Sequence, residues 1–209
     1  SSVTGVFRIG IEAPERRSCW PADAEIQIRY TVNGTSLLSE IRVTNPDDLP
    51  LPWGFGTHAY FNVPFLAGTE REDYTIMVPS ETVVELLDSL PTGAVVAVPS
   101  EKSLRAGRSF ARLRADDVYS QLIPEEDSIR CRIDHEMSGI CLEQRCSLDF
   151  REMVVFTPWW SSSICMEPYT CMTNAINLQQ RAINAGLRTL LPGEQWTGCI
   201  DLHVSRRRD

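Results

Sequence analysis

Apolar and polar positions alternate along most of the chain with a period of two, which is typical of half-buried β-strands. The clearest run is residues 24–32, where Ile26 and Ile28 alternate with polar neighbours. A second alternating run covers residues 37–44, and Asn33-Gly34 lies between the two runs. Because both positions of an Asn-Gly turn favour positive φ, the pattern predicts an antiparallel hairpin with one buried face.

Further alternating or apolar runs predict strands in residues 1–11, 74–79, 82–87, 94–98, 128–135, 139–150, 153–157 and 195–204. Proline and glycine predict turns at residues 45–52, 91–93 and 191–194. Helix evidence is limited to residues 173–185, whose apolar positions form no regular stripe. Many short strands with turns between them predict an all-β sandwich or barrel, and the length fits a single domain over residues 1–209.

The charge balance excludes some classes of partner. The chain has 20 basic and 28 acidic residues, a formal net charge of −8. Nucleic acids and anionic membranes favour basic surfaces, so we expect neither as a partner. No apolar run reaches the length of a membrane span, and the basic end at residues 206–208 is expected to be a solvated tail. A neutral sugar is compatible with this charge, because sugars are recognised through hydrogen bonds and aromatic faces.

The cysteines and the missing motifs limit the chemistry. Seven cysteines are present, an odd number, and no two have CxxC spacing. This pattern predicts reduced thiols in a cytoplasmic protein rather than a disulfide framework or a thiolate zinc site. The sequence has no glycine-rich nucleotide motif and no HExxH motif, so we expect no cofactor and no metal.

His58 is the histidine with the most unusual surroundings. Gly54 and Gly56 permit sharp backbone turns just before it, and Trp53 and Tyr60 add flat apolar faces of the kind that pack on sugar C–H groups. An imidazole can give and take a proton near neutral pH. A histidine held in an aromatic core is an equally good interpretation of these residues alone.

Glu167 is the second candidate. It lies in an apolar run and is followed by Pro168, which disfavours helical geometry at Glu167 and ends the strand. Partial burial at a strand end disfavours the charged carboxylate and raises its basicity. Buried structural ion pairs have the same sequence appearance, so this alternative also stays open.

Two acidic and two aromatic residues have weaker signals. Asp116 and Asp117 follow a turn, where adjacent acids are most often solvated. Trp159 and Trp160 could stack on a sugar ring, but tryptophan is highly buried on average, so we expect at least one of them in the core.

Read together, these segments resemble the aldose 1-epimerase family. Residues 55–62 (Phe-Gly-Thr-His-Ala-Tyr-Phe-Asn) are similar to the segment around its catalytic histidine. Residues 165–170 (Cys-Met-Glu-Pro-Tyr-Thr), followed by Asn-Ala-Ile-Asn, match its catalytic glutamate segment. Asp116-Asp117-Val118-Tyr119 resembles its sugar-contacting aspartate segment, and Pro91-Thr92-Gly93 and Leu191–Glu194 resemble two of its turns. The matches follow the family's order.

The resemblance implies a galactose-mutarotase-like sandwich of two large antiparallel sheets. It implies that His58 is the general acid at the ring oxygen, Glu167 the base at the C1 hydroxyl and Asp116 a substrate-positioning residue. Tyr60 and Trp53 complete the expected sugar contacts. The expected activity is aldose 1-epimerisation of a free hexose, by acid–base ring opening without metal or cofactor.

One departure from the family leaves alternatives open. The chain looks like the carboxyl-terminal two-thirds of the family fold and lacks positions matching an arginine and a further histidine of its amino-terminal part. A non-catalytic carbohydrate-binding or regulatory module, a hexose 6-phosphate epimerase, and a sugar-processing lyase or hydrolase on the same fold are the alternatives. Uncovered sheet edges would favour a homo-oligomer.

Overall fold

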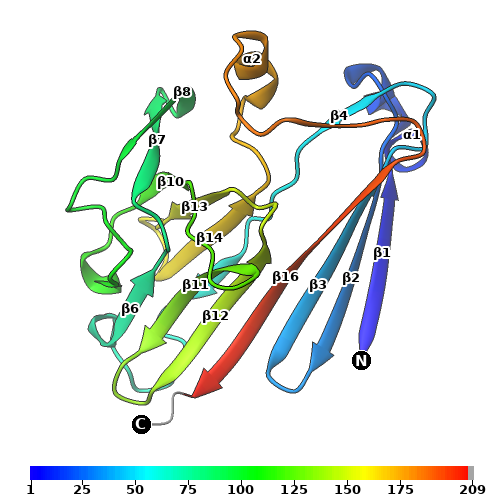
Figure 1. Cartoon of the computed structure of the whole chain (residues 1–209). Coiled ribbons are helices and arrows are strands. Elements are labelled where there is room, and N and C mark those ends of the chain that lie inside the picture. The colour runs from blue at the N-terminus through cyan, green and yellow to red at the C-terminus, as the bar shows by residue number, and fades with distance from the viewer. Residues whose placement is uncertain (207–209) are drawn as a thin grey trace.

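Two antiparallel sheets make up most of the protein in this computed structural model, which describes residues 1–206 (Figure 1). The larger sheet has the strand order β1 (Ser2–Arg8), β2 (Glu25–Asn33), β3 (Ser36–Thr44), β16 (Gln195–Arg206), β12 (Ile140–Ser147), β11 (Ser128–His135), β6 (Tyr74–Met77) and β9 (Arg108–Ser109). The smaller sheet has the order β5 (Tyr60–Asn62), β14 (Ser163–Tyr169), β13 (Glu152–Phe156), β10 (Asp116–Ser120), β7 (Thr82–Leu87) and β8 (Leu90–Ala97). A separate pair joins β15 (Arg188–Leu190) to β4 (Leu51–Trp53).

Helices are few and short among the described residues. They are α1 (Ile9–Glu12), α2 (Ala175–Gln180) and the 3-10 turns Pro14–Cys19, Arg71–Asp73 and Phe110–Arg112. α2 lies inside residues 173–185, where the weak helix signal was found. In the described part of the chain, no helix has the length and apolar character needed to cross a membrane.

The core lies between the two large sheets. Ile41 and Ile133 of the larger sheet join one buried cluster with Met153, Val155 and Met166 of the smaller sheet. On β11 the buried residues alternate with polar ones, and on β13 Met153 and Val155 alternate with less buried residues, so the inner face of each strand is apolar and is covered by the other sheet. The prediction of an all-β fold built from two large antiparallel sheets is confirmed.

The predicted hairpin forms, with its loop one residue later than expected. β2 and β3 pair from Glu25↔Thr44 to Asn33↔Ser36, so Gly34 and Thr35 make the loop. Gly34 has a φ of 58°, whereas Asn33 belongs to the strand. The Asn-Gly signal therefore identified the right hairpin but the wrong pair of loop residues.

The predicted turn at residues 91–93 is wrong. These residues lie in β8, which pairs with β7 through Leu87↔Leu90. The turn is made by Asp88 and Ser89, which have φ values of 50° and 63°. Gly93 has a φ of 96° and lies inside β8, opposite the point between Val84 and Leu86 where the pairing register of β7 shifts. The positive φ of this glycine therefore belongs to an irregularity within the strand pair and not to the turn.

Two further expectations differ from the structure. Trp159 and Trp160 are 90% and 60% exposed, so the expectation that one of them lies in the core is wrong. They lie in the connection between β13 and β14 and pack edge-to-face on each other rather than into the sandwich. Arg206 belongs to β16 rather than to a tail, and the other two tail arginines lie outside the described residues.

The inner face of the larger sheet continues beyond the area that the smaller sheet covers. Val43 and Ile41 on this face are buried, but Val3, Phe7 and Tyr30, which the register places on the same face of β1 and β2, are exposed. Figure 1 shows β1 and β2 at the side of the molecule away from β7 and β8. The apolar alternation of β1 and β2 is thus not matched by burial.

Candidate active site

Three side chains at the end of β14 share the face of the smaller sheet that points away from the core. They are Cys165, Glu167 and Tyr169, spaced two residues apart, and alternate strand residues point to the same side. The alternate residues of β14 point in the opposite direction, and two of these, Ile164 and Met166, join the main core. The sequence Ile-Cys-Met-Glu-Pro-Tyr therefore places a carboxylate between a thiol and a phenol.

Neighbouring strands add to the same face. Tyr60 of β5 pairs with Cys165, Cys165 pairs with Phe156 of β13, and Phe156 pairs with Asp116 of β10. These four residues form one row across the sheet, because paired residues in antiparallel strands point to the same side. Tyr60 and Asp116 are both exposed, so the sheet brings two predicted sugar contacts to the face that carries Glu167.

A glycine-containing loop brings His58 to this face. Phe55 N–H donates to Thr170 Oγ1 over 2.8 Å, and Thr170 N–H donates to the Phe55 carbonyl over 2.9 Å, so the loop is fastened to the end of β14. A Cβ atom on Gly56 would lie 2.4 Å from the ring of Tyr169. Glycine is therefore needed for the loop to pass this close to β14 and to present His58 beside Glu167.

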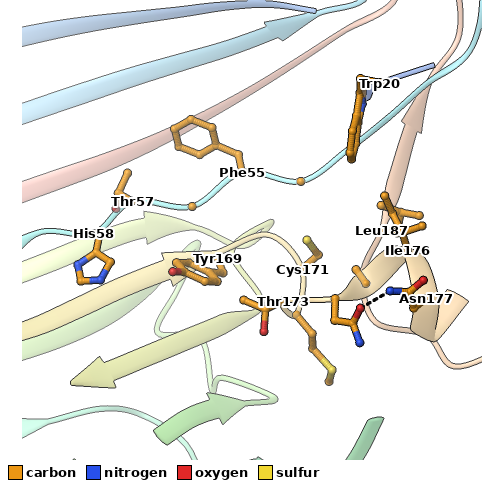
Figure 2. Close-up of a pocket in the computed structure, with 15 residues that line it drawn as sticks. Trp20, Phe55, Thr57, His58, Tyr169, Cys171, Thr173, Ile176, Asn177 and Leu187 are labelled. Atoms are coloured by element: carbon orange, nitrogen blue, oxygen red, sulfur yellow. Dashed lines mark hydrogen bonds between the residues drawn. The ribbon is translucent and has the colours of Figure 1, made fainter. Parts of the chain in front are cut away.

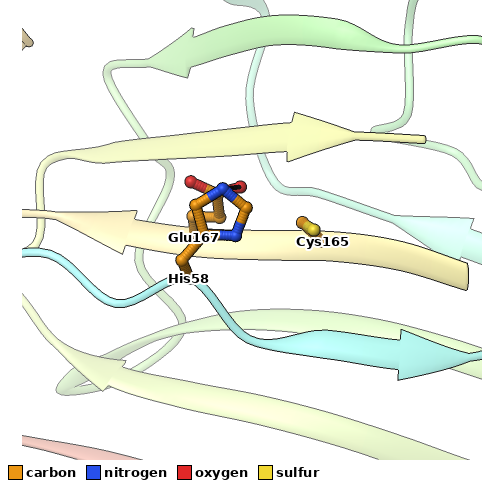
Figure 3. A group of neighbouring side chains, drawn as sticks. All are labelled: His58, Cys165 and Glu167. Carbon is orange, nitrogen blue, oxygen red and sulfur yellow. Dashed lines mark ion pairs between the residues drawn. The ribbon is translucent and has the colours of Figure 1, made fainter. Parts of the chain in front are cut away.

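His58 and Glu167 are in direct contact although more than a hundred positions separate them in the sequence. Nε2 of His58 lies 3.1 Å from Oε1 of Glu167, with the imidazole 53% exposed and the carboxylate only 2% exposed. Figure 3 shows the ring lying against the carboxylate, with Cys165 beside them along β14. The imidazole of His58 is therefore accessible to solvent, whereas the carboxylate of Glu167 is buried beside it.

Burial sets the electrostatics of Glu167. It raises the pKa of this carboxyl group, and the negative charge of Asp116 acts in the same direction. A hydrogen bond from the Tyr169 hydroxyl, 2.8 Å from Oε2, opposes the increase, as do the charge of His58 and a hydrogen bond from Cys165. The net result is a raised pKa, so the ionised group is a stronger base than an ordinary glutamate.

Tyr60 supports the imidazole and the thiol. Its ring stacks on that of His58 with centroids 5.1 Å apart and an angle of 18° between the planes. Its hydroxyl is hydrogen-bonded to Cys165, and burial together with this bond raises the pKa of Tyr60. Tyr60 therefore contacts both the imidazole of His58 and the thiol of Cys165.

A cavity of about 540 Å³ opens beside the pair (Figure 2). His58 and Tyr169 line one end, Phe55 lies between, and Trp20 and Leu187 line the other end together with α2. Its volume is within the range of small-molecule sites. Among the described residues that line it, none is a lysine, arginine, aspartate or glutamate.

Trp53 is not part of this arrangement. It is buried in the main core, where its ring packs on Trp196 with centroids 4.8 Å apart. Its position in β4, paired with β15, places it inside the molecule rather than on the site face. The expected sugar contact from Trp53 is therefore a misinterpretation of a core aromatic.

Sequence reasoning did not assign a role to Tyr169 or Cys165. The signal was available, because residues two positions before and after Glu167 in a strand share its face. Tyr169 bonds the carboxylate directly, and Cys165 contacts both Glu167 and Tyr60.

Comparison with known proteins identifies the family. A sequence profile described as "Aldose 1-epimerase" matches residues 4–203 of the chain. The chain belongs to the aldose 1-epimerase family. The family resemblance of the His58 and Glu167 segments is thereby confirmed at the level of the whole match, while the roles of individual residues stay predictions.

Similar proteins agree with this placement. A protein from Cenchrus ciliaris named "Putative glucose-6-phosphate 1-epimerase" is 27% identical over 196 residues, covering 91% of this chain and 53% of its own length. The crystal structure of a galactose mutarotase-like protein from Clostridium acetobutylicum superimposes with a TM-score of 0.88 at 22% identity, covering 99% of this chain and 63% of that one. An aldose epimerase homologue from C. elegans gives a TM-score of 0.78 at 22% identity, with 99% and 66% covered.

These matches confirm the galactose-mutarotase-like fold. The chain spans about half the length of the Cenchrus ciliaris protein and about two-thirds of the solved structures. Which part of the relatives it corresponds to stays a prediction.

Proposed function

We propose that the protein interconverts the α and β anomers of a free hexose, with His58 as general acid and Glu167 as general base. The contact of 3.1 Å between Nε2 and Oε1 is the observation that carries this proposal. Membership of the aldose 1-epimerase family supports an isomerase acting on a sugar.

The short distance fits the chemistry of a hemiacetal. The ring oxygen O5 and the hydroxyl oxygen O1 are bonded to the same carbon, so groups that serve them must be near neighbours. A sugar entering from the exposed His58 side would separate the two side chains and accept one contact from each. Hydrogen bonds at such sites often reach their reactive geometry only in the complex.

Opening the sugar ring requires one proton to be removed from the sugar and another to be donated to it. Glu167 takes the proton from O1 while His58 gives a proton to O5, the C1–O5 bond breaks and the C1–O1 bond becomes a carbonyl. Rotation about C1–C2 turns the other face of the aldehyde to O5. O5 then attacks C1, O1 recovers a proton from Glu167, and His58 recovers its own from O5. The catalyst ends unchanged, and each group contributes about 10²–10⁴-fold.

Tyr60 and Asp116 are proposed as substrate contacts on the same face. Tyr60 offers an exposed ring beside His58, and Asp116 offers an exposed carboxylate to sugar hydroxyls. Asp116 also keeps the Glu167 pKa high through its charge, so its removal is expected to affect both binding and the base.

A free hexose is favoured over a sugar phosphate by the lining of the cavity, since the described residues around it include no lysine or arginine. Arg42 lines a different surface, on β3 and β16, and Arg105 is paired with Glu81. The name of the Cenchrus ciliaris relative supports a hexose 6-phosphate as the second candidate. Phosphate groups usually need arginine or lysine, which is why we rank it second.

A location in the cytoplasm remains a prediction. It is supported by the seven cysteines, all within the described residues and all free. Homo-oligomerisation also remains a prediction.

The test is polarimetry of freshly dissolved α-glucose and α-galactose, with α-glucose 6-phosphate in parallel. The proposal predicts faster mutarotation of a free hexose and a loss of about 10²-fold or more in His58→Gln and Glu167→Gln. His203→Gln is the matched control, because His203 lies on β16 in the other sheet and bonds Ser36.

Three results would overturn or redirect the proposal. Sugar binding by calorimetry without any rate increase would favour a binding module. Acceleration restricted to the phosphate would favour the second candidate. Cleavage of a methyl glycoside would favour a hydrolase, which needs a second carboxylate such as Asp116 opposite Glu167.

A further inference from the structure

A thiol, a carboxylate and an imidazole converge at one point on the outer face of the smaller sheet. One potential ligand atom each from His58, Cys165 and Glu167 lies within 4.8 Å of the other two. Within residues 1–206 this is the one group of three histidine, cysteine, aspartate or glutamate side chains with such geometry. Figure 3 shows Cys165 and Glu167 side by side on β14, with His58 reaching them from the loop before β5.

We propose that His58, Cys165 and Glu167 form a binding site for Zn²⁺ or a similar thiophilic divalent cation, which inhibits the enzyme reversibly. The site deepens the function proposed above, because the cation would occupy the same acid and base that act on the sugar. The chemical class follows from the ligands: imidazole nitrogen, thiolate sulfur and carboxylate oxygen are the donors that zinc combines in proteins.

The geometry suits a tetrahedral ion. Zinc holds nitrogen and oxygen ligands at about 2.0–2.1 Å and sulfur at about 2.3 Å, so its ligand atoms lie about 3.5 Å from one another. The distance of 3.1 Å between His58 Nε2 and Glu167 Oε1 is close to this value, and the limit of 4.8 Å for the whole group requires only small side-chain movements. Three protein ligands leave the fourth position for water.

The surroundings provide an entrance and a rigid floor. Cys165 and Glu167 are buried and lie on one strand, whereas His58 is half exposed, so an ion would enter from the His58 side. Tyr169 holds the second oxygen of Glu167, and Tyr60 contacts the sulfur and the imidazole ring. Ligands held by such neighbours bind metals more tightly than free side chains do.

Spacing along the chain could not reveal this site. His58 is separated from the β14 ligands by more than a hundred residues, so no metal motif exists in the sequence. The expectation of no metal was based on such motifs alone. The inhibitory ion proposed here is not a cofactor of the reaction.

Metal binding is balanced in protons. Binding the cation breaks the S–H bond of Cys165, forms the metal–sulfur bond and releases one proton to solvent.

Co²⁺ is the direct probe, because a thiolate–cobalt bond gives a charge-transfer absorption that nitrogen and oxygen ligands do not. We expect the wild-type chain to bind one Co²⁺ with this absorption, to release it to excess Zn²⁺, and to lose the absorption in Cys165→Ser. Cys131→Ser is the matched control, since Cys131 is equally buried but lies on β11 in the other sheet. Its cobalt spectrum should equal that of the wild type.

Inhibition is measured separately by mutarotation with added Zn²⁺ and recovery with EDTA. Zinc should slow the wild type in proportion to site occupancy, and Cys165→Ser, compared with its own zinc-free rate, should require at least tenfold more zinc. An inactive chain that still shows the Cys165-dependent cobalt band would refute the proposed function and keep the metal site. A folded, active chain without that band, or one with an unchanged band in Cys165→Ser, would refute the metal site.

Discussion

Glu167 illustrates which features of the site could be predicted from the sequence and which could not. Its apolar neighbours and Pro168 predicted a partly buried carboxylate at a strand end, and the structure has it buried at the end of β14 with a raised pKa. The contact with His58 came only from the family resemblance, because no local pattern links two positions so far apart. The hydrogen bond from Tyr169 was missed, although a spacing of two residues pointed to it.

Replacing Glu167 by glutamine should separate activity from stability. Because burial raises the pKa of Glu167, the folded protein holds this proton more strongly than the unfolded chain. The free energy of unfolding of the wild type therefore falls as pH increases from the usual carboxyl pKa through the raised one. Glu167→Gln removes this loss, so it should gain stability relative to wild type between pH 4 and pH 7 while losing activity.

Urea denaturation of the wild type and Glu167→Gln at pH 4 and pH 7 measures the effect. The difference in unfolding free energy should favour the glutamine variant more at pH 7 than at pH 4. A difference that moves in the opposite direction would mean that the carboxylate is stabilised, not destabilised, by its surroundings.

Tyr169→Phe should move the pH profile. The Tyr169 hydroxyl donates to Glu167 and lowers its pKa, so its removal raises that pKa further. The acidic limb of kcat/KM for mutarotation should then shift to higher pH than in the wild type. A purely structural role for Tyr169 would lower the rate at every pH without shifting the limb.

At the scale of elements, alternation predicted the strands well and turn chemistry predicted the turns less well. The strand at residues 128–135 has the expected alternation of burial, and the hairpin of β2 and β3 and the strand near residues 153–157 form where they were expected. The turn at Asp88-Ser89 was missed because positive φ at non-glycine residues has a weak sequence signal, and Pro91 and Gly93 gave a stronger but misleading one. β4 and β15 are three residues each, too short for any period to appear.

The loop before β5 gives a prediction about positioning. In Gly56→Ala the new methyl would lie 2.4 Å from the Tyr169 ring, so the loop must move and take His58 with it. A displacement of about 1 Å can cost about 10²-fold in rate. We expect kcat/KM to fall by about that factor.

Gly5→Ala is the control for this change. Its Cβ meets no atom within 4 Å, and it lies on β1 in the other sheet. It should keep wild-type activity. Full activity of Gly56→Ala would mean that the loop does not set the position of His58.

For the whole molecule, the sandwich could be predicted from the sequence, but the extent to which one sheet covers the other could not. Strand count and alternation predict a sandwich or barrel, and the family resemblance implies two packed sheets. The spatial order that leaves β1 at an edge depends on pairings between distant segments. The apolar alternation of β1 and β2 predicted a buried face, and the structure leaves Val3, Phe7 and Tyr30 exposed on it.

Two valine substitutions on this face measure the difference in burial between β3 and β1. Val43 is 3% exposed and Val3 is 66% exposed, and both lie on the inner side of the larger sheet. Val43→Ala should cost about 2 kcal/mol of unfolding free energy. Val3→Ala should cost about 0.5 kcal/mol or less. Equal losses in denaturant unfolding would show that the β1 face is covered in solution.

The proposed mechanism requires His58 and Glu167 to act together on one carbon of one sugar. A double-mutant cycle of mutarotation rates, with the wild type, His58→Gln, Glu167→Gln and the double variant, tests it most directly. Because the two groups serve the same bond-breaking event, we expect an accelerated wild type and a double variant about as slow as the slower single variant. Independent losses that multiply in the double variant, or a wild type no faster than the uncatalysed reaction, would contradict it.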